Sequence, residues 1–135
     1  MEVLARYTGG KKFEVVARGH RVMCDQPLDN GGSNQGMSPP EFLLASLATC
    51  AGYYAAEYLN TRGLPTRELE VGVTAQKALH PARLGSFRIE IATQSLDERS
   101  QQGILRAVKG CLVHNTLLGT PNIEVTVHSA AQRAA

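Results

Sequence analysis

The chain has 135 residues, with 14 Lys and Arg against 12 Asp and Glu, so its formal net charge is only +2. This balance argues against a nucleic-acid or membrane-surface partner, because both need a concentrated basic patch. The length suits one domain, which we expect to cover residues 1–135. No apolar run is long enough to predict a transmembrane helix.

The cysteines are three in number, Cys24, Cys50 and Cys111. An odd number, in a chain whose first residues lack the features of a signal peptide, argues against a disulfide scaffold and favours a cytoplasmic location. No CxxC pair supports a thioredoxin-like motif or a zinc ribbon. We therefore expect neither a metal nor a cofactor.

The first third of the chain predicts three short strands, at 2–8, 12–18 and 20–24. Gly9-Gly10 and Gly19 separate them and are typical of hairpin turns. Residues 25–37 (DQPLDNGGSNQGM) are rich in Gly, Asn, Asp and Pro, which predicts one long loop. A loop of this length in a small domain is often functional or mobile.

A long helix is predicted from Pro39 to about residue 61. Ser38 can cap it, Pro39 suits its first position, and Glu41 can complete a capping box, while Gly63 marks its end. Its apolar residues surround almost the whole helix, which indicates a buried helix. A chain of this size can hardly cover such a helix alone, so the pattern predicts burial against a second subunit.

Residues 68–76 and 87–91 alternate between apolar and polar side chains, as half-buried strands do. We expect them to form a hairpin joined by residues 78–85.

A second helix is predicted to begin at Ser95 or Asp97 and to carry Cys111 near its C-terminal end. Alternation over 123–127 predicts a last strand, and the tail 129–135 is expected to fray. The order βββ-α-ββ-α-β predicts an α+β fold with antiparallel sheets and helices packed on one face.

Cys50 and Cys111 are the candidates for chemistry, although free cysteines often serve only as small buried apolar residues. Cys50 reacts only as a thiolate, and burial disfavours that form, so a nearby cation must offset the cost. Glu41 could hold such a cation in place, or could simply cap the helix. The candidate cations lie in the N-terminal hairpins: Lys11, Lys12, Arg18 and Arg21.

His114 follows Cys111 by three residues, a spacing that could serve one metal or a Cys–His pair. No second pair of ligands supports a closed metal site, so a partly exposed histidine near a helix end is the favoured interpretation. Cys24 is expected to pack within its strand.

Two segments together carry a resemblance to a known family. Residues 36–50 (GMSPPEFLLASLATC) resemble the segment that leads into the first cysteine of the OsmC/Ohr peroxide-resistance proteins. Residues 111–117 (CLVHNTL) are similar to the Cys-Pro-Val-x-Asn-Thr-Leu segment around that family's second cysteine. The order and separation of the two segments also suit the family.

The resemblance implies an intertwined homodimer, with strongly curved sheets around two long central helices and an active site at each interface. Cys50 would attack an organic or fatty-acid hydroperoxide to give a sulfenic acid, and Cys111 would resolve it as a disulfide. A dithiol, such as a lipoyl group on a partner protein, would reduce that disulfide. An apolar pocket would accept the substrate, with Leu47, Tyr53 and Tyr54 as its candidate residues.

The sequence also departs from the family pattern. Lys11 and Lys12 stand where peroxidase members carry an arginine, and Glu41 is nine residues before Cys50 rather than ten. Leu112 replaces the usual proline. This spacing looks more like the broader OsmC-like branch.

Two alternatives therefore stay open beside the peroxidase. One is a non-catalytic dimer that binds a small hydrophobic ligand at its interface. The other is a different thiol enzyme with Cys50 as its nucleophile and His114 as its base.

Overall fold

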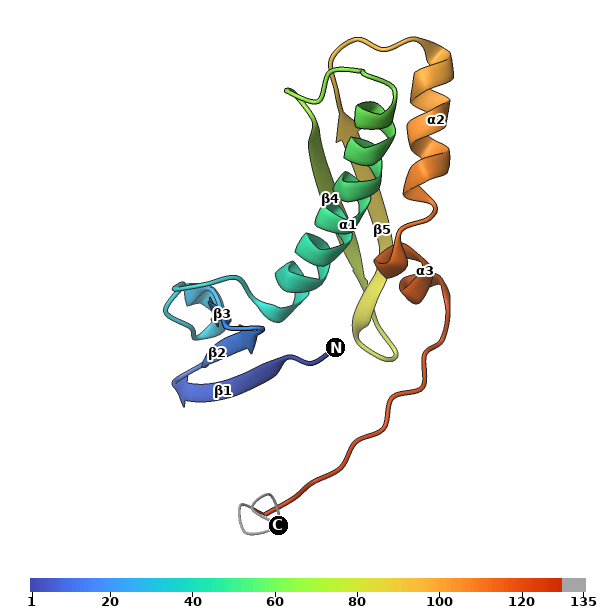
Figure 1. Ribbon diagram of the computed structural model, residues 1–135. Coiled ribbons are helices and arrows are strands. Elements are labelled where there is room, and N and C mark those ends of the chain that lie inside the picture. Colours follow the sequence, from blue (N-terminus) through green and yellow to red (C-terminus); the bar gives the residue numbers. More distant parts are fainter. Residues whose placement is uncertain (130–135) are drawn as a thin grey trace.

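The computed structural model describes residues 1–129 and begins with a three-stranded antiparallel sheet (Figure 1). Its strands are β1 (Leu4–Gly9), β2 (Lys12–Ala17) and β3 (His20–Cys24), in that spatial order. The turn between β1 and β2 needs positive φ at both Gly9 and Gly10, which glycine adopts without strain. The sequence prediction for this sheet is confirmed to within about two residues at the strand ends.

The loop from 25 to 37 is held together by the carboxylate of Asp25, which is 0% exposed. This carboxylate accepts backbone N–H groups from Gln26 at 2.8 Å and from Ser33 and Gln35 at 3.1 Å each. A short 3-10 helix, η1 (Leu28–Asn30), lies within it. The loop is therefore a folded segment that hydrogen bonds to the Asp25 carboxylate hold together.

Helix α1 (Pro39–Thr61) begins where the sequence predicts. The Glu41 carboxylate accepts the Ser38 backbone N–H at 2.7 Å and the Ser38 hydroxyl at 2.9 Å. Within the single chain only one stripe of the helix is buried: Leu47, Ala51, Ala55 and Leu59. Burial on every side, which the sequence predicts, is not reached within one chain, and Tyr53 is 62% exposed.

Strands β4 (Glu70–Ala78) and β5 (Arg83–Ala92) form the antiparallel hairpin that the sequence predicts. Its connection is shorter than expected, because the pairing continues to Ala78 and Arg83 and leaves only residues 79–82 unpaired. Helix α2 (Glu98–Val108) begins after Asp97, whose side chain accepts the Ser100 N–H at 2.8 Å. These elements pack on α1 around the core of Ala51, Ala55, Leu59, Ile104 and Val108.

The position predicted for Cys111, inside the second helix, is wrong. Helix α2 ends at Val108, where tight bonds from Gly110 N to Ala107 O (2.9 Å) and from Cys111 N to Val108 O (3.0 Å) close its last turn. A separate short helix, α3 (Leu112–Leu118), then starts with Cys111 as its N-cap. Gly110, a poor residue for a helix interior, stands at the break.

The last predicted strand is also wrong for the single chain. Ile123, Val125 and Val127 are 79%, 84% and 92% exposed, and no strand of the described residues pairs with them. Figure 1 shows this segment leaving α3 and running away from the body of the chain. The fraying predicted for the tail concerns mainly residues 130–135, which lie outside the described residues.

The N-terminal sheet lies at the first turn of α1, apart from the body that α1, α2, α3, β4 and β5 form (Figure 1). One of its faces is apolar and open, and with the start of α1 it encloses a cavity of about 530 Å³. We call this the apolar sheet face; its apolar residues are Val3, Ala5, Phe13, Val15, Ala17, Val22 and Cys24, and His20 lies on the same face. No helix in residues 1–129 is long and apolar enough to cross a membrane.

Candidate active site

The side chains of Cys50 and Cys111 lie close together, and each changes the pKa of the other. Cys50 lies in the middle of α1 and is half-buried, and Cys111 lies at the start of α3 and is 0% exposed. Both are free thiols. The break between α2 and α3 makes this meeting possible, because it turns the start of α3 toward α1.

The surroundings of Cys50 favour its thiolate. Burial raises the pKa of the Cys50 thiol, but hydrogen bonds from the Cys111 thiol and from the backbone N–H groups of Val113 and Leu112 outweigh it. The net pKa of Cys50 is therefore lower than that of an ordinary cysteine. Donors that point at a sulfur stabilise its charged form more than its neutral form.

The same contact has the opposite effect on Cys111. Burial and the hydrogen bond that it donates to Cys50 both raise the pKa of the Cys111 thiol. The His114 backbone N–H reaches the Cys111 sulfur at 3.4 Å and offsets only part of this rise. The pair thus divides into a sulfur that ionises readily and a sulfur that keeps its proton.

A cavity of about 530 Å³ lies between α1, β5 and α3, and neither Cys50 nor Cys111 lines it. We call it the thiol-side cavity; most of its lining is apolar, from Leu47, Leu84, Phe87, Ile89, Leu117 and Leu118. Leu47 is one helical turn before Cys50, and His114, which also lines the cavity, is one turn after Cys111. Tyr53 and Tyr54 are not among the lining residues.

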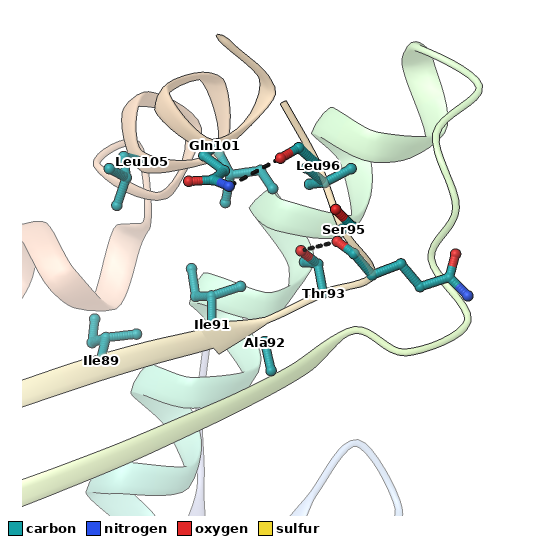
Figure 2. A pocket seen from close by; sticks show the side chains of 10 residues that line it. Ile89, Ile91, Ala92, Thr93, Ser95, Leu96, Gln101 and Leu105 are labelled. Carbon is teal, nitrogen blue, oxygen red and sulfur yellow. Dashed lines mark hydrogen bonds between the residues drawn. The ribbon is translucent and has the colours of Figure 1, made fainter. Parts of the chain in front are cut away.

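A second cavity, of about 480 Å³, opens between the end of β5 and the start of α2 (Figure 2). Gln101 Nε2 donates to the Leu96 carbonyl at 3.0 Å and Thr93 Oγ1 to the Gln94 carbonyl at 2.9 Å along its wall. No lining residue is ionisable or nucleophilic beyond simple hydroxyls. The cavity therefore offers space but no group suited to peroxide chemistry.

The candidate cations lie in the N-terminal region, and none of them contributes to the pKa of Cys50 within this chain. Lys12 Nζ donates to Gln35 Oε1 at 3.2 Å and lies near enough to Asp25 to lower the pKa of that carboxyl. Lys11 lies beside Gly31 in the same loop.

The two candidate arginines, Arg18 and Arg21, and Glu41 also lie in the N-terminal hairpins or at the first turn of α1. Arg18 is in the turn between β2 and β3, and Arg21 forms an ion pair with Glu14 at 3.0 Å. Glu41 bonds to Ser38, and these bonds lower the pKa of its carboxyl. The single chain therefore brings the two predicted thiols together but leaves the predicted ionic groups around α1's first turn and the hairpins.

Sequence reasoning missed the two backbone donors, from Leu112 and Val113, because their role depends on the helix break. Gly110, directly before Cys111, is the signal that could have found it. Within residues 1–129, no group of three or more His, Cys, Asp and Glu side chains could hold a metal ion. The Cys111–His114 spacing instead produces a bond from the histidine backbone to sulfur.

Residues 32–127 match the family model described as OsmC-like protein. No curated protein matches the sequence. The fold is similar to a Psychrobacter arcticus protein named for osmotic stress induction and detoxification response, with 23% identity, a TM-score of 0.77, and coverage of 84% of this chain and 85% of that chain.

It is also similar to an OsmC like protein from Mycoplasma pneumoniae, with 21% identity, a TM-score of 0.73 and coverage of 87% and 86%. An organic hydroperoxide resistance protein OsmC from Legionella pneumophila shares 17% identity at a TM-score of 0.62, with coverage of 88% and 90%. These likenesses establish the α+β fold.

Proposed function

Because the chain belongs to the OsmC-like protein family, we propose that it is a thiol-dependent peroxidase that reduces organic hydroperoxides, including those of fatty acids. The observation that carries the proposal is the close approach of the Cys50 and Cys111 thiols, which lowers the pKa of Cys50 and raises that of Cys111. A peroxidase of this kind needs such a pair, because the thiolate attacks the peroxide first and the neutral thiol attacks the resulting sulfenic acid afterwards.

In the proposed reaction the Cys50 thiolate attacks the terminal oxygen of R–O–OH. The O–O bond breaks, Cys50 becomes a sulfenic acid, and the alkoxide RO⁻ takes a proton to leave as the alcohol. Cys111 then attacks the Cys50 sulfur, which releases water and closes a disulfide. A dithiol reductant, for which a lipoyl protein is our candidate, restores both thiols by exchange.

The thiol-side cavity supports the choice of an organic peroxide over hydrogen peroxide. Its lining is mostly apolar, so an alkyl or aryl group gains free energy by leaving water for this space. Leu47, which lines the cavity, lies one helical turn before Cys50 on α1. A substrate whose organic group enters the cavity would thereby hold its peroxide group beside the thiols.

The proposal includes a homodimer. The apolar sheet face and the exposed side chains of 123–127 leave apolar surface that a second chain can cover. In such a dimer the cations Lys11 and Lys12 of one chain could approach the thiols of the other. Free thiols suit the cytoplasm, where we place the protein.

Peptide mass spectrometry after one equivalent of cumene hydroperoxide tests the proposal, with Cys50→Ser and Cys111→Ser as the matched pair. The reduced wild type should lose two hydrogens and yield a Cys50–Cys111 linked peptide. Cys111→Ser should stop as the Cys50 sulfenic acid, which dimedone traps, and Cys50→Ser should stay reduced. If Cys50 and Cys111 of the wild type remain reduced in excess peroxide, the proposal is wrong.

Two observations favour a second candidate function, a non-catalytic dimer that binds a hydrophobic ligand. The cavity at the apolar sheet face has an almost wholly apolar lining, and no cation contributes to the pKa of Cys50 within the chain. This candidate predicts that an apolar probe such as a fatty acid binds equally well to the wild type and to Cys50→Ser. It also predicts that neither protein consumes peroxide.

A further inference from the structure

We propose that His114 is the proton donor of the reaction, which carries the Cys50 proton to the alkoxide that leaves when the O–O bond breaks. This inference rests on the proposed peroxidase function and adds a residue to it. It starts from the placement of His114, whose side chain is half-buried and lines the thiol-side cavity.

The placement follows from the geometry of α3. Residues 114, 117 and 118 share one face of this helix, and all three line the cavity. Cys111 stands at the N-terminal end of the same face, and the His114 backbone N–H contacts its sulfur at 3.4 Å. The imidazole therefore enters the cavity one turn from the sulfur pair, where the peroxide oxygens would lie.

The contacts of the imidazole suit a group that exchanges protons. Its Nδ1 lies 3.4 Å from Asn115 Oδ1, an oxygen that can only accept, so this contact is a hydrogen bond in the neutral tautomer that carries its hydrogen on Nδ1. Nε2 is then the basic nitrogen that accepts a proton and returns it. The contact with Asn115 thus favours the tautomer that the proposed role requires.

No other group of the cavity can take this role. The remaining lining residues, from α1, β5 and α3, are apolar or carry an uncharged hydroxyl. Of the basic residues on β5, Arg83 donates to the carbonyls of Leu79 and Pro81, and Arg88 is exposed between the inward-facing Phe87 and Ile89. Among the lining residues of this cavity, His114 is therefore the only ionisable group.

The proton balance closes over one cycle. Cys50–SH gives its proton to His114 and becomes the thiolate, which attacks R–O–OH; Cys50–SOH forms, and the leaving RO⁻ takes the proton from His114 as ROH. Neutral His114 then accepts the Cys111 proton while Cys111 attacks Cys50–SOH, and it returns that proton to the hydroxide, which leaves as water. Two thiols and one hydroperoxide thus yield one disulfide, one alcohol and one water.

The test compares leaving groups in His114→Gln, with His80→Asn in the exposed turn between β4 and β5 as the control. An alkyl hydroperoxide expels an alkoxide, which needs a proton, whereas a peracid expels a stable carboxylate, which does not. Conversion of Cys50 to its sulfenic acid, trapped with dimedone before the resolving step, is followed in the full-length reduced protein with cumene hydroperoxide and with perbenzoic acid. Alkylation of Cys50 by iodoacetamide reports the thiolate independently.

We expect His114→Gln to slow the reaction with cumene hydroperoxide roughly 100-fold, the scale of general acid catalysis. The reaction with perbenzoic acid and the alkylation of Cys50 should stay within about threefold of the wild type, since the backbone N–H groups that bear on the sulfurs remain. His114→Asn should behave as His114→Gln does, and His80→Asn as the wild type.

An equal loss with both oxidants would overturn the inference and give His114 a packing role, as would no loss with either. A wild type that reduces neither oxidant would overturn the proposed peroxidase itself. That result is distinguishable, because it concerns the unmodified protein and not the variant.

Discussion

The N-terminal region and the body of the chain are ordered by different forces. In the body, α1 and α2 bury an apolar core against β4 and β5. In the N-terminal region the buried residues are Cys24 and Asp25 alone, and the loop depends on the hydrogen bonds of the Asp25 carboxylate. The apolar sheet face of this region stays open.

This difference bears on the site, because its parts are divided between the two regions. The thiol pair belongs to the body, whereas Lys11 and Lys12 belong to the N-terminal region. An apolar face that finds no cover within its own chain points to another surface as its partner. We infer that the body supplies the reactive sulfurs and that association completes their surroundings.

A charge on the apolar sheet face should produce the largest effect, because it tests directly whether this face is covered by a second chain. Val22, which pairs with Val15 across β2 and β3, is 49% exposed, so Val22→Lys leaves the single chain folded. In a dimer the lysine would be buried without a partner. We expect the dissociation constant of the dimer to rise about 100-fold or more, measured by sedimentation equilibrium.

Arg21→Ala, on the opposite face of the same strand, is the control and should leave self-association unchanged. If Val22→Lys associates as the wild type does, the apolar sheet face is not the interface.

The packing of the body should respond next most strongly. A Cβ on Gly103 would overlap the ring of Tyr58, over which the Arg62 guanidinium stacks at 3.9 Å. Gly103→Ala should therefore force α1 and α2 apart and lower the free energy of unfolding by about 1–3 kcal/mol. Urea unfolding followed by circular dichroism measures the change.

Gly72→Ala is the matched control, since nothing lies within 4 Å of the added carbon on β4. It should be neutral or should stabilise the strand slightly. Equal effects of the two substitutions would show that the close approach at Gly103 carries no energetic weight.

The contrast between the regions also explains what the sequence could predict. Local patterns determine the hairpins and α1, because Gly9-Gly10, Ser38 and Glu41 act on their neighbours in the chain. The break before Cys111 was missed because the apolar spacing continues through it, and tertiary contact with α1 decides where α2 ends. The segment 123–127 has the alternation of a strand, but alternation does not supply a sheet edge to pair with.

The candidate site was likewise predictable in part. The two cysteines could be singled out, and the structure brings them together. Their cationic partner could not be placed, because no pattern says which hairpin faces which helix, or in which chain. The donors Leu112 and Val113 act through backbone N–H groups, which every residue except proline has, so their side chains give no signal.

Within the thiol pair, Cys111→Ala should separate the role of the hydrogen bond from that of burial. Without the thiol donor the pKa of Cys50 rises, so less thiolate is present near neutral pH. We expect iodoacetamide to alkylate Cys50 about tenfold more slowly at pH 7, the scale of one charge-assisted hydrogen bond, and equally fast at high pH. Cys111→Ser keeps a donor and should lie closer to the wild type; identical profiles for the two variants would contradict the assigned cause.

The smallest effect should come from the ion pair of the N-terminal region. Arg21 Nη1 lies 3.0 Å from both carboxylate oxygens of Glu14, but the side chains are 63% and 30% exposed. Water and salt screen such a pair, so Arg21→Ala should lower the free energy of unfolding by about 0.5 kcal/mol or less, and by still less in 1 M NaCl. Urea unfolding at both salt concentrations measures this. A loss above about 1 kcal/mol would mean that this ion pair, and not the Asp25 loop, orders the N-terminal region.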